Sequence, residues 1–383
     1  MRRDKYIARL QECSGLNVIF QLTDKCVLSC KYCFAKGAHD GKPATFSSEM
    51  LEQAIKQSFE TRHTHVTFEW TGGEPLLVGL DFFKKVVEFQ KKYANKPYSN
   101  GVQTSGNLLD KELIDYLLEE NFGLSTTIDG IESVHDRNRP SAKNTPSLKN
   151  VQKTREYISS KGHYCGFIST VTKNNLGHEK EALDYFRKLG ISTFHSNPYI
   201  YYSKNKVKDS TIALSNEDYA KYFIAEFNAW LETGIYLPIP KTIRDILQCL
   251  KQKSPINNTI CTFGGRCLTN FIALTPNGDA YNCPKFTGSE NMLLGNITKL
   301  SIREILSLEN KQISLLIDQR VAALNKCKKK NCEYFYICNG GCPYHSFIAS
   351  NGENVSELDC LCEGKTLLFQ YLESVIDHAE SKI

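Results

Sequence analysis

The sequence contains no apolar run long enough to cross a membrane, although 41% of its 383 residues are hydrophobic. The first residues include two arginines but neither an apolar stretch nor a small-residue cleavage site, so a secretory signal is not expected. The net charge of +5 is small and spread along the chain, which argues against nucleic acid as a partner. The sequence also lacks a repeat of fixed period and a low-complexity linker. We therefore expect a sizeable core and neither a membrane nor a nucleic-acid partner.

Cysteine, in contrast, is abundant and unevenly distributed. The chain has 15 cysteines, an odd number, and it is not a small exported chain, so metal binding or redox chemistry is favoured over a disulfide framework. Cys13, Cys165 and Cys249 stand alone, and each is most simply a small buried hydrophobic residue. The others form one group near the N-terminus and one in the last third. This separation predicts two structural regions with separate metal sites.

The first part of the chain alternates between short β-branched runs and amphipathic helical segments. For example, Phe46 and Ser47 resemble a staple and cap for a helix in which Leu51, Ile55 and Phe59 share one face. Such alternation predicts an α/β fold with a parallel sheet, either doubly wound or curled into a barrel, with ligands at the carboxyl ends of the strands. The expected strands cover residues 17–22, 65–70, 101–104, 123–128, 165–171 and 193–200.

The pattern changes after about residue 203. Amphipathic helices are expected around residues 219–227 and 243–250, followed by a β-hairpin over residues 271–281 with the turn Pro276-Asn277-Gly278. A last helix is expected over about residues 365–379. We therefore divide the chain into residues 1–205, a helical bridge over 206–260 and a Cys-rich region over 261–383.

The first cysteine group, Cys26-x3-Cys30-x2-Cys33, lies in the loop after the first strand. Three such close thiolates cannot complete a tetrahedral zinc site alone, and no histidine precedes His39 in this loop. They can hold three irons of a [4Fe–4S] cube and leave the fourth iron open. An open iron suits chemistry on a bound ligand, whereas full ligation suits electron transfer. Zinc and chance spacing remain as alternatives.

With Tyr32 and Phe34 beside its last cysteine, this spacing resembles the signature of radical S-adenosylmethionine (SAM) enzymes. Thr71-Gly72-Gly73-Glu74-Pro75-Leu76, directly after the second strand, matches the GGEP motif of that family. The resemblance implies a partial (β/α)6 barrel and SAM bound near Phe34, Gly72, Gly73 and Glu74. It also implies a 5′-deoxyadenosyl radical that abstracts hydrogen from a substrate. We expect the glycines to let backbone carbonyls approach the cofactor closely.

Three further positions of the cofactor pocket follow from the same resemblance. Ser105 lies in a polar strand end, and Thr127 would supply a hydroxyl to the ribose. Arg139, in a segment similar to the HD-x-x-R of one subgroup, would pair with the cofactor carboxylate. Asp129 is expected to be a structural turn residue. The alternative is that these polar residues only cap helices and turns.

The C-terminal cysteine array resembles the SPASM domain, which carries two auxiliary [4Fe–4S] clusters. The resemblance assigns Cys261, Cys267, Cys283 and Cys342 to the first cluster and Cys327, Cys332, Cys338 and Cys360 to the second. Four residues separate Cys327 from Cys332, where the family usually has two, and Cys362 is a spare that can replace a neighbour. Three clusters are then expected in all, with a zinc-ribbon-like staple as the alternative for this region.

The resemblance implies an oxidoreductase that acts on a peptide or protein. Sulfatase-maturing relatives, which make formylglycine, use an aspartate directly after the third cysteine of the first auxiliary set, and Pro284 occupies that position here. We therefore favour a maturase that forms a thioether or carbon–carbon crosslink in a ribosomally made peptide, because the auxiliary clusters can accept the second electron. Formylglycine formation is the second choice. Peptide epimerisation is the third, with Cys165 as a weak candidate for its hydrogen donor.

A non-catalytic iron–sulfur electron carrier is the competing class, but it would not need the GGEP motif. An enzyme of this kind requires a precursor peptide as substrate and a reductant such as flavodoxin or ferredoxin. Tyr199, Tyr201 and Tyr202 either line a peptide channel or pack between regions. Oxygen-sensitive clusters predict a cytoplasmic setting.

Overall fold

The computed structural model describes residues 1–35, 45–202, 209–234, 237–254 and 261–380. The domain boundary predicted at 205/206 lies outside these residues, and the one at 260/261 lies at the edge of a described segment. Within the described part, no helix is both long enough and apolar enough to span a membrane.

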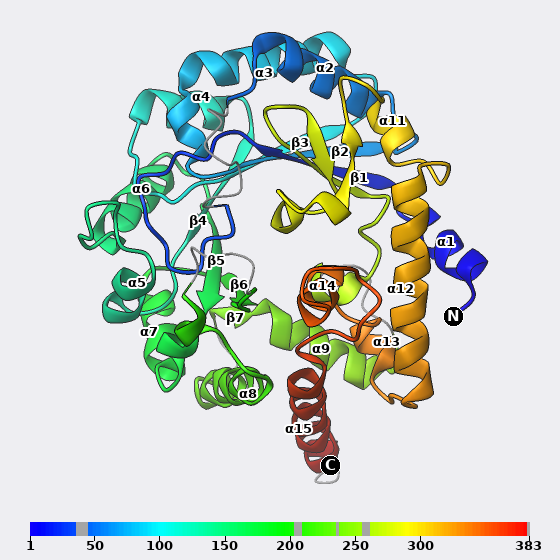
Figure 1. Cartoon of the computed structure of the whole chain (residues 1–383). Helices are drawn as coiled ribbons and strands as arrows, with labels where there is room; N and C mark the ends of the chain where they lie inside the picture. The colour runs from blue at the N-terminus through cyan, green and yellow to red at the C-terminus, as the bar shows by residue number, and fades with distance from the viewer. Residues whose placement is uncertain (36–44, 203–208, 235–236, 255–260, 381–383) are drawn as a thin grey trace.

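A parallel sheet forms the centre of the first part of the chain, as the alternating pattern predicts. Strands β1 to β6 pair in sequence order, each parallel to the next, and the short β7 extends the sheet beyond β6. Figure 1 shows the strands curling into an open arc, which confirms a partial barrel. The strands are β1 (Gly15–Gln21), β2 (His65–Thr71), β3 (Tyr98–Gln103), β4 (Phe122–Thr127), β5 (Gly166–Val171), β6 (Thr193–Pro198) and β7 (Ile239–Pro240).

Helices cover the outer face of this arc (Figure 1). In α2 the predicted cap is confirmed, because the Ser47 hydroxyl accepts a hydrogen bond from Met50 N at 3.2 Å. Leu51, Ile55 and Phe59 are buried on one side of this helix. The helices of this layer are α2 (Ser48–Phe59), α3 (Leu80–Tyr93), α4 (Lys111–Glu119), α5 (Glu132–Asn138), α6 (Leu148–Ser160), α7 (Glu179–Lys188) and α8 (Asn216–Glu232).

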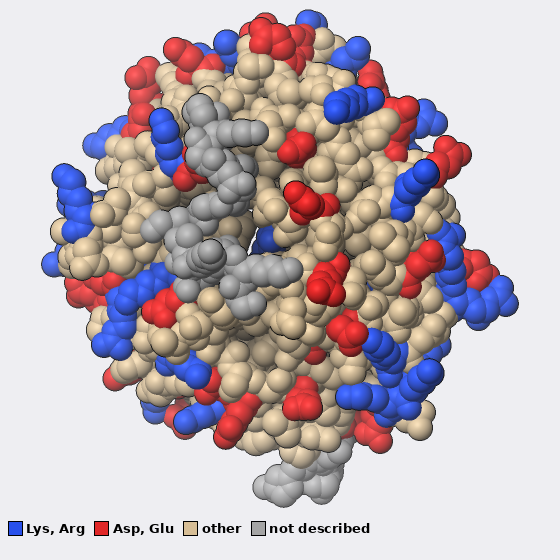
Figure 2. Space-filling model, viewed as in Figure 1, with Lys and Arg blue, Asp and Glu red and all other residues tan. Residues whose placement is uncertain are grey.

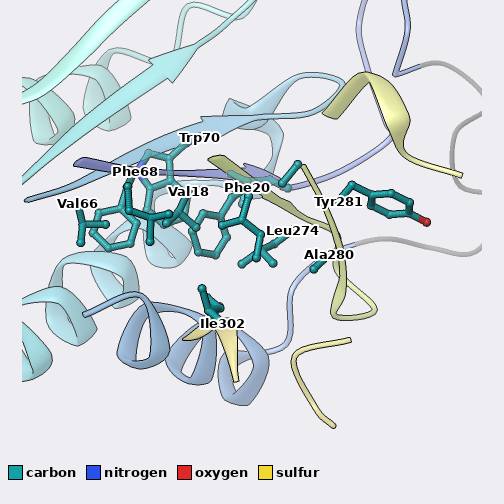
Figure 3. Packing of buried hydrophobic residues seen from close by; sticks show 14 of the residues in the cluster. Val18, Phe20, Val66, Phe68, Trp70, Leu274, Ala280, Tyr281 and Ile302 are labelled. Atoms are coloured by element: carbon teal, nitrogen blue, oxygen red, sulfur yellow. The ribbon is translucent and has the colours of Figure 1, made fainter. Parts of the chain in front are cut away.

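The packing of β1 and β2 explains why their sequences alternate. Val66, Phe68 and Trp70 of β2 are fully buried, whereas the polar residues between them are only half-buried. Phe20 of β1 stacks on Trp70 with ring centroids 4.5 Å apart. Figure 3 shows these side chains packed together with Ile302 from the C-terminal region. One continuous core therefore joins the two parts of the chain.

The predicted hairpin is present, and it continues the sheet of the barrel. Strand β8 (Phe271–Leu274) pairs parallel with β1, and β9 (Asp279–Tyr281) and β10 (Leu293–Asn296) follow as antiparallel neighbours. The turn needs Gly278, which has a φ of +85°. The Cys-rich region is therefore joined to the barrel by hydrogen bonds between strands as well as by side-chain packing.

The remaining helices lie beside and across the open side of the arc. Helix α14 lies across it, α1 packs against α12, and α15 packs against α8 (Figure 1). The sequence analysis did not predict α1. These helices are α1 (Arg3–Gln11), α9 (Lys241–Gln252), α10 (Cys261–Gly264), α11 (Ile302–Ile305), α12 (Lys311–Lys329), α13 (Phe335–Cys338), α14 (Pro343–Ala349) and α15 (Cys362–Glu380). Short 3-10 turns occur at η1 (Pro75–Val78), η2 (Lys173–Asn175), η3 (Ser210–Ile212), η4 (Pro284–Phe286) and η5 (Glu290–Met292).

Candidate functional site

A cavity of about 350 Å³ lies at the carboxyl ends of the parallel strands. Residues at or just after the ends of β2 to β6 line it, which is where an α/β sheet gathers its ligands. Figure 2 shows a hollow near the centre of this face, with charged side chains of both signs scattered around it. The predicted site residues on its wall are Cys26, Cys30, Cys33, Phe34, Gly72, Gly73, Ser105, Thr127 and Arg139.

The loop that carries the first three cysteines is held by backbone hydrogen bonds to the last residue of α5 and to the segment just after it. Ser29 N donates to Pro140 O at 2.8 Å, and Lys31 N donates to Asn138 O at 2.9 Å. Burial raises the pKa of the Cys30 thiol to about 12, although the nearby Arg139 opposes this effect. Because only thiolates ligate iron, a metal has to displace the proton from this thiol when it binds.

The two glycines of the GGEP motif bring that turn against the cysteine loop. A Cβ atom on Gly73 would lie 2.2 Å from the Lys25 carbonyl oxygen, and one on Gly72 would lie 2.6 Å from Thr23 O. Two backbone hydrogen bonds also join the turn to this loop. Gly73 N donates to Thr23 O at 2.6 Å, and Glu74 N donates to Lys25 O at 2.8 Å. The glycines line the cavity, as predicted, but the atoms nearest to them are backbone atoms of the loop.

Glu74, predicted to contact the cofactor, does not line the cavity and is fully buried. Its carboxylate accepts hydrogen bonds from the Thr104 hydroxyl at 2.7 Å, from Ser105 N at 2.9 Å and from the Ser105 hydroxyl. A buried carboxylate requires such donors. Glu74 therefore joins the end of β2 to the end of β3 and acts as a positioning residue. Ser105 faces the cavity, but its hydroxyl already donates to Glu74.

Arg139 has the properties expected of a residue that binds a cofactor carboxylate. Its guanidinium is buried, and Nη1 donates to the Tyr32 hydroxyl at 2.7 Å. Nε of Arg139 is buried without a hydrogen-bond partner among the described residues. The Tyr32 hydroxyl in turn donates to Asp129 Oδ2 at 2.7 Å. Arg139 also lines this cavity, and a buried cationic group with an unpaired donor fits an anionic ligand, so the residues present fit the predicted cofactor.

Thr127 and Asp129 take different roles in the site. Thr127 lines the cavity, where its hydroxyl accepts a hydrogen bond from Gln103 Nε2 at 3.2 Å. Asp129 lies behind the wall, where it binds Tyr32 and accepts a hydrogen bond from Thr170 N at 3.0 Å. Asp129 is therefore structural, as expected, and it orients Tyr32, whose role the sequence analysis did not assign.

Cys165, the weak candidate for a hydrogen donor, is placed away from the site. It precedes β5, at the amino end of the strand, and it does not line the cavity. Its thiol is 1% exposed and lies near the Thr126 hydroxyl in the hydrophobic core. The structure therefore does not bring Cys165 to the site, and its position fits the simpler prediction of a small buried side chain.

The first C-terminal cysteine set adjoins the cavity, since Cys261 lies on its wall. Burial raises the pKa of Cys261 to about 11 and that of Cys283 to about 12, and neighbouring thiols of the same set add to both shifts. Burial also raises the pKa of Cys267, and repulsion from the neighbouring thiols of Cys261, Cys342 and Cys283 adds to this rise. Four cysteines, of which Cys342 is buried, Cys267 and Cys283 are half-buried and Cys261 is exposed, therefore share one environment, which fits thiolate ligation of a cluster.

The second set surrounds a small separate cavity of about 20 Å³. Its four cysteines are Cys327, Cys332, Cys338 and Cys362. The order of the cysteines assigned Cys360 to this set, but Cys360 does not line this cavity. Among the described residues, no three His, Cys, Asp or Glu side chains are close enough to hold one metal ion. A four-iron cube accepts thiolates that are spread more widely around it.

This geometry predicts different effects for two neighbouring cysteines. Cys362→Ala is expected to lower the iron content by about four irons per chain, because one cluster loses its fourth thiolate. Cys360→Ala, two residues away, is the matched control and is expected to keep the full iron content. Iron and sulfide analysis with electron paramagnetic resonance of the reduced protein measures both. Loss of a cluster in Cys360→Ala alone would show that the sequence-based assignment was correct.

Comparison with known proteins also indicates a radical SAM domain. Residues 20–186 match the model of the radical SAM superfamily. The chain is 26% identical to a cysteine-type anaerobic sulfatase-maturating enzyme of Clostridium perfringens over 90% of this chain and 93% of that protein. It is 25% identical to a serine-type enzyme of Bacteroides thetaiotaomicron, over 94% and 89% of the two chains.

Solved structures share the fold over nearly the whole chain. The structure of anSMEcpe with bound AdoMet and Kp18Cys peptide matches with a TM-score of 0.81 and 25% identity, over 96% of this chain and all of that chain. SuiB of Streptococcus suis bound to precursor peptide SuiA matches with a TM-score of 0.65 and 15% identity, over 94% and 79% of the chains. The second likeness shows the fold alone. Residues 20–186, which bring the three-cysteine loop and the GGEP turn to one cavity, are therefore a radical SAM domain, and a Cys-rich C-terminal region follows it.

Proposed function

We propose that this enzyme oxidises a cysteine or serine side chain within a peptide segment of its substrate to formylglycine. The observation that carries the proposal is the similarity to sulfatase-maturating enzymes of both types, which extends over the barrel and the Cys-rich region alike. The sequence analysis placed peptide crosslinking first. The likeness to SuiB, at 15% identity, is weaker support for that reaction.

The residues of the cavity fit a nucleotide cofactor of the radical SAM type. Cys26, Cys30 and Cys33 would hold the cluster, and Arg139 would hold the cofactor carboxylate through its unpaired Nε. When bound, the cofactor supplies a carbon radical that removes one hydrogen atom from the substrate. The protein has to place the substrate Cβ against that radical and exclude water. Thr127 and Phe34 also line this cavity.

We further propose two auxiliary clusters, which makes three clusters in the chain. The first would be held by Cys261, Cys267, Cys283 and Cys342, and the second by the four cysteines around the small cavity. Formation of an aldehyde from a thiol or an alcohol removes two electrons. Hydrogen abstraction accounts for one of them, so the protein needs an acceptor for the other. A cluster ligated by Cys261 would lie at the wall of the substrate cavity.

One observation favours crosslinking as a second candidate. Pro284, at the start of η4, stands where the sulfatase-maturing pattern has an aspartate, and proline cannot accept a proton. The tyrosines after β6 have separate roles, since Tyr199 lines the cavity and Tyr202 packs against Phe347 with ring centroids 5.4 Å apart. Tyr199 is therefore available to contact a peptide. A precursor peptide, a flavodoxin or ferredoxin as reductant, and a cytoplasmic setting belong to this proposal.

The test is an anaerobic assay with SAM, dithionite and three versions of one sulfatase-type peptide that carry Cys, Ser or Ala at the target position. We expect 5′-deoxyadenosine from all productive reactions and an aldehyde, trapped by a hydrazide and located by mass spectrometry, in the Cys or Ser peptide. The Ala peptide is expected to give no aldehyde. Formation of a crosslink instead of an aldehyde would favour the second candidate, and 5′-deoxyadenosine without either product would refute both.

A further inference from the structure

We propose that the imidazole of His345, oriented by Asp359, accepts the proton that leaves the substrate heteroatom during oxidation. This inference rests on the proposed function and identifies the base that Pro284 cannot supply. It assigns a catalytic role to His345 and a positioning role to Asp359.

His345 is placed to meet a bound substrate. It lies on α14 and lines the same cavity as the three cysteines of the first loop and Arg139. Its Nδ1 lies 3.1 Å from each carboxylate oxygen of Asp359. Because Nδ1 donates to that carboxylate, Nε2 carries the lone pair of the neutral ring. Burial also lowers the pKa of His345, which keeps the ring neutral and able to accept a proton.

Several hydrogen-bond donors hold the carboxylate of Asp359 in place. Its carboxylate accepts from Lys365 Nζ at 2.7 Å, from Cys342 N at 2.9 Å and from Leu361 N at 2.9 Å, in addition to His345. Lys365 forms a buried ion pair with this carboxylate, which favours the ionised form of Asp359. A buried carboxylate on the far nitrogen of a histidine orients the ring and stabilises the imidazolium that forms.

Other groups in the cavity are poorer acceptors. No aspartate or glutamate is among the described residues that line it. Lys285 lies over the Tyr344 ring at 5.3 Å, and an ammonium group has no lone pair to accept a proton. Burial raises the pKa of Tyr344, so its hydroxyl stays protonated. Among these side chains, the neutral imidazole of His345 is the group suited to general-base catalysis.

A cysteine substrate would lose its two electrons in two separate one-electron steps. Removal of one Cβ hydrogen atom leaves a carbon radical beside the thiol. The S–H bond then breaks, its proton goes to His345 Nε2, and one electron goes to an oxidised [4Fe–4S] cluster, which is reduced. A C=S double bond forms, and water converts this thioaldehyde to the aldehyde with release of hydrogen sulfide. A serine substrate loses its O–H proton to the same nitrogen and gives the aldehyde directly.

The test uses the full-length, cluster-loaded enzyme with a peptide whose target cysteine carries deuterium at Cβ. His345→Asn keeps an N–H group for Asp359 but places no basic nitrogen in the cavity. We expect deuterium transfer to 5′-deoxyadenosine to persist, while the yield of aldehyde per 5′-deoxyadenosine falls about a hundredfold. Iron content and peptide affinity, measured without turnover by fluorescence anisotropy, are expected to match the wild type. If His345→Asn loses iron, His345→Gln is measured in its place.

His63→Asn is the matched control, because His63 is also buried but is held by Thr61 and Asn270 outside this cavity. It is expected to keep the wild-type ratio of aldehyde to 5′-deoxyadenosine. An unchanged ratio in His345→Asn would overturn the role of His345 and leave the proposed function intact. The same holds if Lys285→Met, rather than His345→Asn, lowers the ratio. A wild-type enzyme that neither abstracts deuterium nor forms aldehyde would overturn the proposed function and this inference together.

Discussion

A chain in which Cys26, Cys30 and Cys33 are all replaced by alanine is expected to lose all reductive cleavage of SAM. These three thiols lie on the wall of the main cavity and are the candidate ligands of its cluster. The loop itself should keep its shape, because backbone groups hold it, including the bonds from Ser29 N to Pro140 O and from Lys31 N to Asn138 O. The loss is then one of metal ligation and not of folding.

The measurement is 5′-deoxyadenosine formation under dithionite, combined with iron analysis. The other two cysteine sets come from separate segments, so the triple variant is expected to retain about eight irons per chain in its auxiliary clusters. Cys249→Ala is the matched control, since Cys249 is buried in α9 away from the described cysteine sets. If the triple variant still cleaves SAM, the cluster that reduces it lies elsewhere in the chain.

The strands were predictable because their burial alternates. In β2 the odd and even positions face different environments, with Trp70 fully buried and Glu69 only partly so. The same pattern arises in a barrel and in an open sheet, so periodicity alone did not distinguish them. The pairing of β8 with β1 was also unpredictable, because the apolar run from Phe271 to Leu274 does not specify a partner distant in sequence.

The sequence predicted those parts of the candidate site whose signals lie within one short segment. The spacing of Cys26, Cys30 and Cys33 and the GGEP turn each lie within one short segment, and the structure brings them together. The contact between His345 and Asp359 joins two segments that no local motif links, so their pairing became visible only in the fold. A histidine and an aspartate close to ligand cysteines were the available signal.

The sequence did not correctly predict which of Cys360 and Cys362 lines the second cavity. Both follow Asp359 within three residues, and the order of the cysteines assigned Cys360 to the second set with Cys362 as a spare. Helix α15 begins at Cys362, and positions two apart at a helix start do not point to the same side. Cys362 therefore lines the second cavity, and Cys360 does not.

Gly73→Ala is expected to slow SAM cleavage more than any other substitution predicted here except the triple cysteine replacement. The added methyl group would lie 2.2 Å from the carbonyl oxygen of Lys25, and 2.9 Å from that of Asp24. Both are backbone atoms of the cysteine loop, so the contact cannot be relieved by turning a flexible side chain. Either the GGEP turn or the loop has to move, and a shift of about 1 Å in a reacting geometry costs about a hundredfold in rate. Overpacking of this kind also costs about 1–3 kcal/mol in stability.

Gly15→Ala provides the matched control, because a Cβ atom there meets nothing within 4 Å and the residue lies at the opposite end of β1 from the loop. It is expected to keep the wild-type rate, since it leaves the cavity unchanged. The measurement is SAM cleavage at saturating dithionite together with SAM affinity by equilibrium dialysis, with iron content to show that the first cluster is still assembled. A Gly73→Ala enzyme with wild-type rate and affinity would mean that neither the close approach of the turn to the loop nor cofactor binding needs a glycine at this position.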